Sequence, residues 1–562
     1  METPRRRNTW KRLAVLGAIV ALGFSLETTL HAFTYIIDAN GTYWGFQDDG
    51  SPFVDTGSIR GTQVLQATGT GFSPNNAPFS TAINGYGGIR VRVDTTPAPY
   101  MNGEVMRGFG LTFDGVNRFS STKSVNLGGV LVTRSIYVKT SANWARWLDT
   151  LTNTTNQPKI VNIAFGGQSG TGTGTTNNLT TQIASTSSGD ALITASDAWS
   201  VYTSPLQNGF FAGPQAAVIG TPAPFSGAMT FAGNWLYNDS FNSPLLYTGH
   251  ERNFQAYVNT LTIAPHTSRS VLHFLVLGKR FNTAAAASAE RASVEATAGL
   301  LAVTPEIADL SEAEICSIAN FDVAAMSIPD FDYEASCASP AVVPQPAASD
   351  PPHRKTSSKY QVFEKTIQEL RADMAAGITT SREITKAYID RIAAYDIGQF
   401  GFHAFHVVAE NAMGQANAAD KARKKGDSRP LLGIPIAVKS NYDTYDMVTN
   451  NGSFTFHNFR PAHDAFQIAR LRAAGAVILG KTGMSEYATS GAWGNDAYGQ
   501  VYNAFNPSKS SVASSAGTGA GVAASFAGAG MGSQTGNSLY GPSSAESLFT
   551  LRVAPRISWT AG

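Results

Sequence analysis

The stretch of this sequence with the strongest chemical character is a run of small residues at positions 506–547. Serine, glycine and alanine dominate the run, and it carries almost no charge. Such a backbone exposes its N–H groups and hydroxyls, which suits a site where the backbone must approach a reacting group closely. A flexible linker has a similar composition. However, apolar residues recur at Val512, Val522, Phe526 and Met531, and a linker has no need of them. We therefore expect a folded site.

A lysine earlier in the chain has the setting that a base requires. Lys439 follows a wholly apolar run at 434–438 (IPIAV). A lysine acts as a base only when neutral, so burial or a neighbouring positive charge must lower its pKa. The apolar run favours a low-dielectric environment. The alternative is a surface lysine that ends a strand.

Three other patterns indicate no chemistry. His403 and His406 (HAFH) lack further metal ligands nearby, so we interpret them as packing or surface residues and expect no metal. The segment 517–521 (GTGAG) has the glycines of a dinucleotide loop, but no strand immediately precedes it and no acidic residue lies about 20 positions on. Ser538 lies outside any Gly-x-Ser-x-Gly elbow, which argues against an α/β-hydrolase. We expect no cofactor.

Four blocks resemble the amidase signature family of serine hydrolases. They are 433–444 (GIPIAVKSNYDT), 480–488 (GKTGMSEYA), 513–520 (ASSAGTGA) and 532–541 (GSQTGNSLYG). Their order is that of the family, and so are the separations of 75 positions from Lys439 to Ser514 and 24 from there to Ser538. One block alone would be weak evidence, whereas four in order are strong. The resemblance covers about 360–552.

The resemblance implies a role for each matching residue. Ser538 would attack the amide carbonyl, Ser514 would relay the proton and Lys439 would accept it. Ser515 would support them with hydrogen bonds; the choice of Ser514 over Ser515 as relay rests on spacing alone. The oxyanion would rest on the backbone N–H groups of Ser538 and of Thr535, Gly536 and Asn537.

The chain also departs from the family pattern. Gln534, Asn537 and Tyr540 stand where the family usually has Asp, Gly and Arg, which leaves the substrate subclass open. The chain stops 24 residues after Ser538, and 553–562 no longer follows the family pattern. The family domain continues well beyond this point, so we expect a truncated domain with impaired activity.

The elements around these blocks alternate between helix and strand from residue 360 onward. Helical patterns occupy 366–376, 411–425, 463–474 and the segment after a capping box at 380–383; strand patterns occupy 432–439 and 476–480. This alternation predicts an α/β domain at 360–562, with an incomplete mixed sheet, mainly parallel, flanked by helices. A small-residue helix is expected between the Ser514 and Ser538 loops.

The first half of the chain has the pattern of β structure. Strand-like runs at 88–93, 130–138, 159–165 and 271–277 lie between clusters of Gly, Asn, Thr and Ser. They predict an all-β, sandwich-like domain at 33–282. A helical segment with a cysteine loop follows at 283–337, and a Pro-rich linker at 338–359.

The two cysteines, Cys316 and Cys337, are the only ones in the sequence. In an oxidising compartment they are expected to pair, closing a loop of about 20 residues that is worth roughly 3 kcal/mol. The alternative is two unpaired buried thiols.

Residues 1–32 have the pattern of a signal peptide. A basic segment precedes a 14-residue apolar core at 13–26, and a plausible cleavage site ends at Ala32. The core is shorter than the roughly 20 residues that a membrane anchor needs. We expect cleavage and export to the periplasm or the cell exterior, by the general or the twin-arginine route. The net charge of +1 gives no reason to expect nucleic acid or a membrane as a partner.

The function that the resemblance implies is hydrolysis of the C–N bond of a small-molecule carboxamide, by a Ser-Ser-Lys mechanism. Two alternatives stay open. One is a secreted β-rich binding or surface protein whose hydrolase remnant is inert. The other is one component of a tRNA-linked amidotransferase, which the export signal opposes because that work is cytoplasmic. The sequence indicates no oligomeric state.

Overall fold

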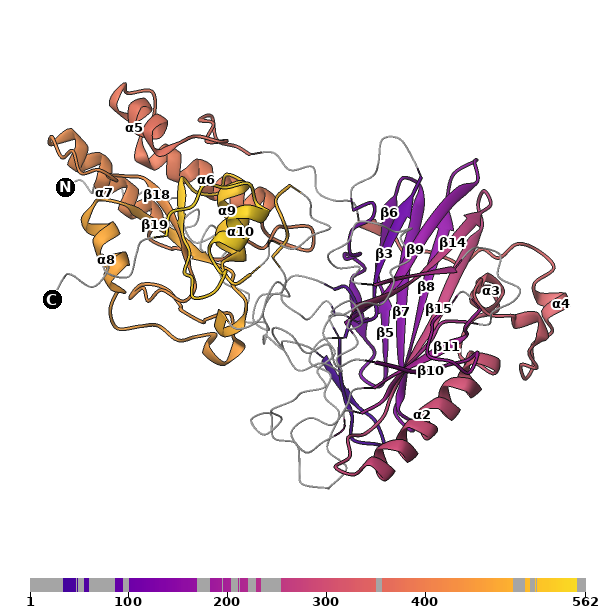
Figure 1. Ribbon diagram of the computed structural model, residues 1–562. Helices are drawn as coiled ribbons and strands as arrows, with labels where there is room; N and C mark the ends of the chain where they lie inside the picture. Colours follow the sequence, from indigo (N-terminus) through magenta and orange to yellow (C-terminus); the bar gives the residue numbers. More distant parts are fainter. Residues whose placement is uncertain are drawn as a thin grey trace, which may run out of the picture.

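The computed structural model describes residues 34–46, 48, 55–59, 86–94, 101–168, 182–194, 196–203, 211, 213–220, 229–233, 254–349, 356–488, 501–505, 511 and 513–552. The described chain has two parts of different architecture, one rich in strands and one of mixed helices and strands (Figure 1). This confirms the expected multidomain fold. The signal peptide expected at 1–32 lies outside the described residues.

The first part is built on a large antiparallel sheet. Its strands are β4 (Leu111–Phe113), β5 (Arg118–Ser121), β6 (Ser124–Leu127), β7 (Val130–Lys139), β8 (Trp144–Asn153), β10 (Gln182–Thr186), β11 (Trp199–Thr203), β12 (Gln215–Val218) and β15 (Ser268–Leu277). The order along the sheet is β10-β11-β12-β15-β8-β7-β5-β4, with β6 paired to β7. Along β7 buried and half-buried residues alternate, as expected for a strand with one face on a core.

A second sheet packs on the inner face of the first. It contains β3 (Gly88–Val93), β9 (Lys159–Gln168), β13 (Met229–Gly233) and β14 (Phe254–Ile263), in the order β13-β14-β9-β3. One buried cluster takes residues from both sheets, and the His273 ring of β15 stacks on the Phe165 ring of β9 at 4.0 Å. A separate hairpin pairs β1 (Thr34–Ile37) with β2 (Tyr43–Phe46). The sandwich-like β fold is therefore confirmed.

The helical segment covers the outer face of the large sheet. Helix α2 (Ala284–Val303) begins one residue after the start expected from its alanine-rich sequence and packs there through Val294, Ala298 and Leu301. Among the described helices, none is both long enough and apolar enough to span a membrane.

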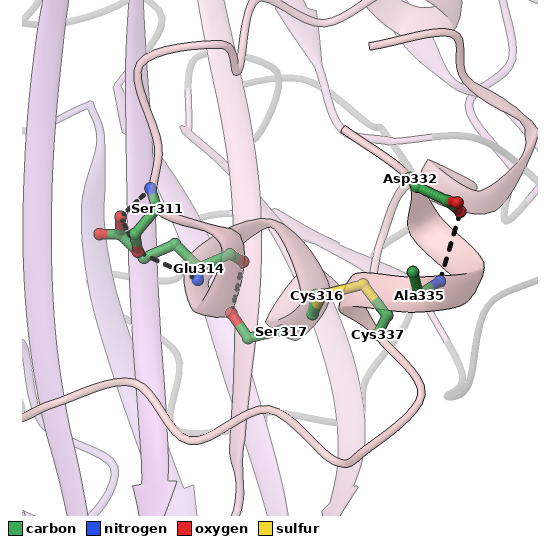
Figure 2. The surroundings of a disulfide bond; sticks show 7 residues. All are labelled: Ser311, Glu314, Cys316, Ser317, Asp332, Ala335 and Cys337. Atoms are coloured by element: carbon green, nitrogen blue, oxygen red, sulfur yellow. Dashed lines mark hydrogen bonds between the residues drawn. A yellow bond between two sulfur atoms is a disulfide. The ribbon is translucent and has the colours of Figure 1, made fainter. Parts of the chain in front are cut away.

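A disulfide closes the loop that follows α2 (Figure 2). Cys316, in α3 (Glu312–Ser317), is bonded to Cys337, the residue after α4 (Tyr333–Ser336), with an S–S distance of 1.91 Å. Ser311 and Glu314 form a reciprocal capping box at the start of α3. The capping box therefore fixes the start of α3, and the disulfide ties the end of α3 to the end of α4.

The start of the Pro-rich segment packs on the sandwich and is not a free spacer. Its β16 (Ala348–Ser349) pairs in parallel with β6. The carbonyl of Ala341 accepts a hydrogen bond of 2.8 Å from the N–H of Ser268. Up to Ser349 this segment therefore belongs structurally to the β part.

The second part has a four-stranded mixed sheet in the order β17-β19-β18-β20. The strands are β17 (Phe405–Val408), β18 (Pro435–Lys439), β19 (Val477–Thr482) and β20 (Ala529–Met531); the helices are α5 (Ile367–Ala375), α6 (Ser381–Tyr395), α7 (Ala412–Lys424), α8 (Phe466–Ala473), α9 (Ala516–Ala523) and α10 (Tyr540–Ala545). β18 runs parallel to β19 and β20, while β17 is antiparallel to β19. The capping box expected before α6 is present at Thr380 and Glu383.

The two parts are in direct contact. Arg107 of the β part is buried and donates from Nε to the carbonyl oxygen of Gln399 at 2.7 Å. Its guanidinium carbon lies 4.3 Å from the centre of the Tyr502 ring. Phe400 packs against the sandwich core. The β part thus contacts the loop between α6 and β17.

Candidate active site

The lysine at the end of β18 lies at the centre of the candidate site. Lys439 is fully buried, and its Nζ lies 2.8 Å from Ser514 Oγ and 2.9 Å from Ser533 Oγ. β18 places it there because the strand is buried along its whole length between β19 and β20. The structure therefore brings together two of the three predicted catalytic side chains, from positions 75 residues apart.

Burial gives this lysine the character of a base. It lowers the pKa of Lys439 to about 7, because a low-dielectric surrounding disfavours the charged form. Within the described parts of the chain, no carboxylate forms an ion pair with it. No described charge therefore offsets the effect of burial, and the neutral amine is well populated above pH 7.

Ser514 is fixed by the small-residue helix α9, which begins two residues later. The helix packs so closely on the turn after β19 that the N–H of Gly517 donates to the carbonyl of Gly483 at 3.0 Å. A Cβ on Gly517 would lie 2.5 Å from that backbone, a distance that side chains cannot tolerate. The absence of a side chain at Gly517 is therefore needed to seat α9 (Figure 1) against the strands.

Ser515 joins the loop of Ser514 to the loop that carries Ser538. Its Oγ donates to the carbonyl of Ser533 at 3.1 Å and accepts from the N–H of Ser533 at 3.3 Å. Its own N–H donates to the carbonyl of Ser538 at 3.2 Å. These are supporting bonds of the kind expected for this residue.

Ser538 is half-buried, and its carbonyl accepts from the N–H of Ser515, the residue next to Ser514. Its hydroxyl makes no hydrogen bond to Ser514 or Lys439 in the described structure. No described group accepts the N–H of Ser538 or of the residues of the predicted oxyanion site. Those residues are solvent-exposed: Thr535, Gly536 and Asn537. Their N–H groups are therefore free to meet a ligand.

Gln534 anchors the loop of Ser538 through its side-chain amide. Its Oε1 accepts from the N–H groups of Leu539 at 3.0 Å and Tyr540 at 2.9 Å. These are donors at the start of α10, where a helix has no internal partners for its first N–H groups. The amide oxygen thus anchors the loop to the helix that follows Ser538.

Sequence reasoning missed two groups that touch the site. Ser533 Oγ contacts Lys439 and accepts from Asn441 Nδ2 at 2.8 Å. Tyr442 donates from its hydroxyl to the carbonyl of Gly532 at 3.0 Å. Both Ser533 and Tyr442 lie inside the family blocks, and that position is the only signal that the sequence offered.

The two histidines take structural positions. His406 Nε2 lies 3.0 Å from Ser440 Oγ, and burial lowers the pKa of His406 to about 3. His403 Nε2 lies 2.7 Å from the carbonyl of Gly398. In the part of the chain that the structure describes, no group of three or more His, Cys, Asp or Glu side chains could hold a metal ion.

The comparison with family models decides the class of this part of the chain. Residues 383–554 match the model of the Amidase family. This segment is an amidase-signature domain. The match contains all of the candidate catalytic residues.

Curated relatives of the amidase-signature domain include components of glutamyl-tRNA(Gln) amidotransferases. One from Roseiflexus castenholzii is 40% identical over 182 residues, which is 32% of this chain and 36% of the relative. The corresponding protein from Chromohalobacter salexigens is 38% identical over 181 residues, 32% of this chain and 37% of the relative. The chain thus spans little more than a third of the relatives that it matches.

Solved structures similar to the domain include two amidases. The native peptide amidase of Stenotrophomonas maltophilia is 37% identical, and the match covers 32% of this chain and 38% of the peptide amidase, with a TM-score of 0.30. Fatty acid amide hydrolase is 26% identical, and the match covers 34% of this chain and 33% of that one, also with a TM-score of 0.30.

Proposed function

We propose that this chain is an amidase that hydrolyses the C–N bond of a small-molecule carboxamide through Ser538, Ser514 and Lys439. The observation that carries the proposal is the buried hydrogen bond of 2.8 Å between Lys439 Nζ and Ser514 Oγ. A lysine with a pKa of about 7, in contact with a serine hydroxyl, is a general base matched to neutral pH. Membership of the domain in the amidase family supports the same chemistry.

In the proposed first step, Ser538 Oγ attacks the carbonyl carbon of the amide. As the new C–O bond forms, the Ser538 proton passes to Ser514 Oγ, and the Ser514 proton passes to the neutral Nζ of Lys439. The carbonyl electron pair moves to oxygen. In this proposal the backbone N–H groups of Ser538 and of Thr535, Gly536 and Asn537 bind that negative oxygen.

In the second step the tetrahedral intermediate collapses and the C–N bond breaks. The proton returns from Lys439 through Ser514 to the leaving nitrogen, which departs as a neutral amine or ammonia. Water then attacks the acyl group on Ser538 with the same base. The carboxylic acid leaves, and Lys439 is neutral again.

An amidotransferase-like role is the second candidate. The observation that favours it is the similarity to the amidotransferase components of Roseiflexus castenholzii and Chromohalobacter salexigens. It predicts that the chain transfers an amide nitrogen to a tRNA-bound acceptor. The export pattern at 1–32 opposes it. The remaining alternative is a secreted β-rich binding protein with an inert hydrolase part.

We also propose that the chain is exported. The support is the signal-peptide pattern at 1–32, together with the disulfide between Cys316 and Cys337, which suits an oxidising compartment. Fractionation of cells that produce the chain, with N-terminal sequencing of the product, tests this. We expect an extracytoplasmic product that begins near residue 33; a cytoplasmic product with residues 1–32 intact would contradict it.

A fluorophosphonate probe tests the amidase proposal directly. We expect the whole chain to be labelled at Ser538, and Ser538→Ala to abolish the labelling. Ser544→Ala is the matched control, because Ser544 is an exposed serine of α10, six residues further on, and its loss should leave labelling unchanged. Equal labelling of the wild type and Ser538→Ala would refute the proposed nucleophile.

Turnover separates the candidate functions. An amidase releases an amine from a simple aryl amide without any second substrate, and Ser538→Ala stops that release. The amidotransferase alternative predicts that nitrogen release needs a charged tRNA. The binding-protein alternative predicts neither turnover nor labelling.

A further inference from the structure

A second buried lysine lies beside the candidate site and has no part in the proposed mechanism. Lys481, on β19, is fully buried, and the backbone of β19 pairs it with Val438, next to Lys439. Burial lowers the pKa of Lys481 to about 7. The positive charge of Arg472 lowers this pKa further, whereas three nearby carboxylates raise it: Asp443, Asp446 and Asp464. Burying this amine beside the candidate site is costly, because its charged form loses its hydration.

The contacts of Lys481 show that it is not a second base. Its Nζ donates to the carbonyl of Tyr442, and it lies 3.2 Å from Thr444 Oγ1 and 2.8 Å from Thr449 Oγ1. No serine of the candidate site is among these partners. Three acceptors satisfy the three N–H groups of an ammonium ion.

Tyr442 connects this lysine to the loop of the nucleophile. The Tyr442 carbonyl accepts from Lys481, while its hydroxyl donates to the carbonyl of Gly532 at 3.0 Å. Gly532 lies six residues before Ser538 and three before Thr535, the first of the predicted oxyanion amides. The neighbouring Asn441 binds Ser533, so the segment after β18 holds this loop at two successive residues.

We propose that Lys481 is a positioning residue, which holds Tyr442 beneath the turn at Gly532 and Ser533 and thereby sets the position of the backbone amides before Ser538. The inference rests on the proposed function for its effect on catalysis. Its structural content, the link from Lys481 through Tyr442 to the loop, stands on the contacts alone. Lys481 acts through Tyr442 and touches no reacting atom.

Hydrogen exchange tests the link without requiring activity. In Lys481→Met, which keeps the length of the side chain but removes its donors, we expect the N–H groups of Ser533, Leu539 and Tyr540 to exchange at least tenfold faster. The N–H of Ser533 belongs to the loop that the link holds and donates to Ser515 Oγ, whereas those of Leu539 and Tyr540 donate to Gln534 Oε1 in that loop. Amides of β15 should exchange at the wild-type rate. Unchanged exchange at the three loop positions would overturn the proposal.

Steady-state kinetics test the consequence of the Lys481–Tyr442 link for catalysis. For Lys481→Met we expect kcat for an aryl amide to fall on the order of 100-fold with KM within about threefold, because misplaced oxyanion donors weaken transition-state binding alone. The pH midpoint should stay that of the wild type, since Lys439 is intact. A variant that loses thermal stability while its kcat per folded molecule is unchanged would show a merely structural role.

Tyr442→Phe tests the same link if Lys481→Met does not fold. It removes only the hydroxyl bond to Gly532, and we expect a loss of about tenfold in kcat and faster exchange at the same amides. The kcat of the double variant should be no lower than that of Lys481→Met, because the two residues act as one unit. Losses in kcat that multiply fully in the double variant would contradict the link. Equal probe labelling of the wild type and Ser538→Ala would instead contradict the proposed function and leave the link untouched.

Discussion

The two parts of the molecule bury positive charge in opposite ways. In the sandwich, Arg134 is fully buried and makes a bidentate pair with Asp149, with N···O distances of 2.7 and 2.9 Å. A further N–H of Arg134 donates to the carbonyl of Thr56 at 2.6 Å. In the amidase-signature domain, Lys439 and Lys481 are equally buried, but their described partners are hydroxyls and a carbonyl.

The difference separates a structural charge from a reactive one. A buried ion is tolerated when a counter-charge and hydrogen bonds replace its hydration, and the Arg134 pair meets that requirement. Lys439 has only neutral partners, so part of the cost of burial appears as a lowered pKa. A lowered pKa next to a nucleophile is a functional signature. Replacing each cation by methionine should therefore have opposite effects on stability.

Lys439→Met is expected to give the largest effect. Labelling at Ser538 should fall on the order of 10⁴-fold, because the base is lost. The folded chain should gain roughly 1–2 kcal/mol near pH 7, because the cost of keeping Lys439 below its ordinary pKa exceeds the two hydrogen bonds lost. Labelling kinetics and urea unfolding measure the two effects, with exposed Lys425→Met as the control. A destabilised variant would contradict the comparison.

Arg134→Met should reverse the sign of the stability change. It leaves the Asp149 carboxylate buried without its partner, which costs about 3–5 kcal/mol. Urea unfolding of the β part measures the loss. Where the variant remains folded, the rate of Ser538 labelling should match the wild type, because the pair lies outside the amidase-signature domain.

The double variant Arg134→Met with Asp149→Leu is the control for that loss. Removing both charges should restore most of the stability, since apolar residues of similar volume replace buried pairs at little cost. A double variant as unstable as Arg134→Met alone would show that packing, not the unpaired charge, explains the effect.

Ser533→Ala is expected to have the smallest effect. It removes one of the two hydroxyls on Lys439 and the acceptor of Asn441, while the Lys439–Ser514 contact remains. We expect the labelling rate to fall about tenfold, the value of one buried hydrogen bond. Thermal unfolding should change little. A loss as large as that of Lys439→Met would make Ser533, rather than Ser514, the first proton acceptor.

Local signals in the sequence account for most of the fold. Alternation along β7, the alanine-rich α2 and the capping box of α6 each determine their element from a few adjacent residues. The pairing of β16 with β6 was not predictable, because a Pro-rich segment has no strand period. The antiparallel direction of β17 likewise depends on contacts between distant segments.

The site was predictable where motifs fix both residue type and spacing, as for Lys439 and Ser514. Ser533 and Tyr442 were missed because their importance lies in contacts with segments about 90 residues away. Lys481 was missed for another reason. A lysine in a short strand pattern gives no sign that it will be buried, and only the packing of β19 reveals it.

The pH dependence of Ser538 labelling in the wild-type chain tests the central claim, that neutral Lys439 activates the nucleophile through Ser514. The pKa of Lys439 lies near 7, below its ordinary value, so the active form is present above pH 7 and is lost as the pH falls. We predict a rate that falls about tenfold per pH unit below 7 and levels off above it. A rate that is constant between pH 5.5 and 8.5 would contradict the account.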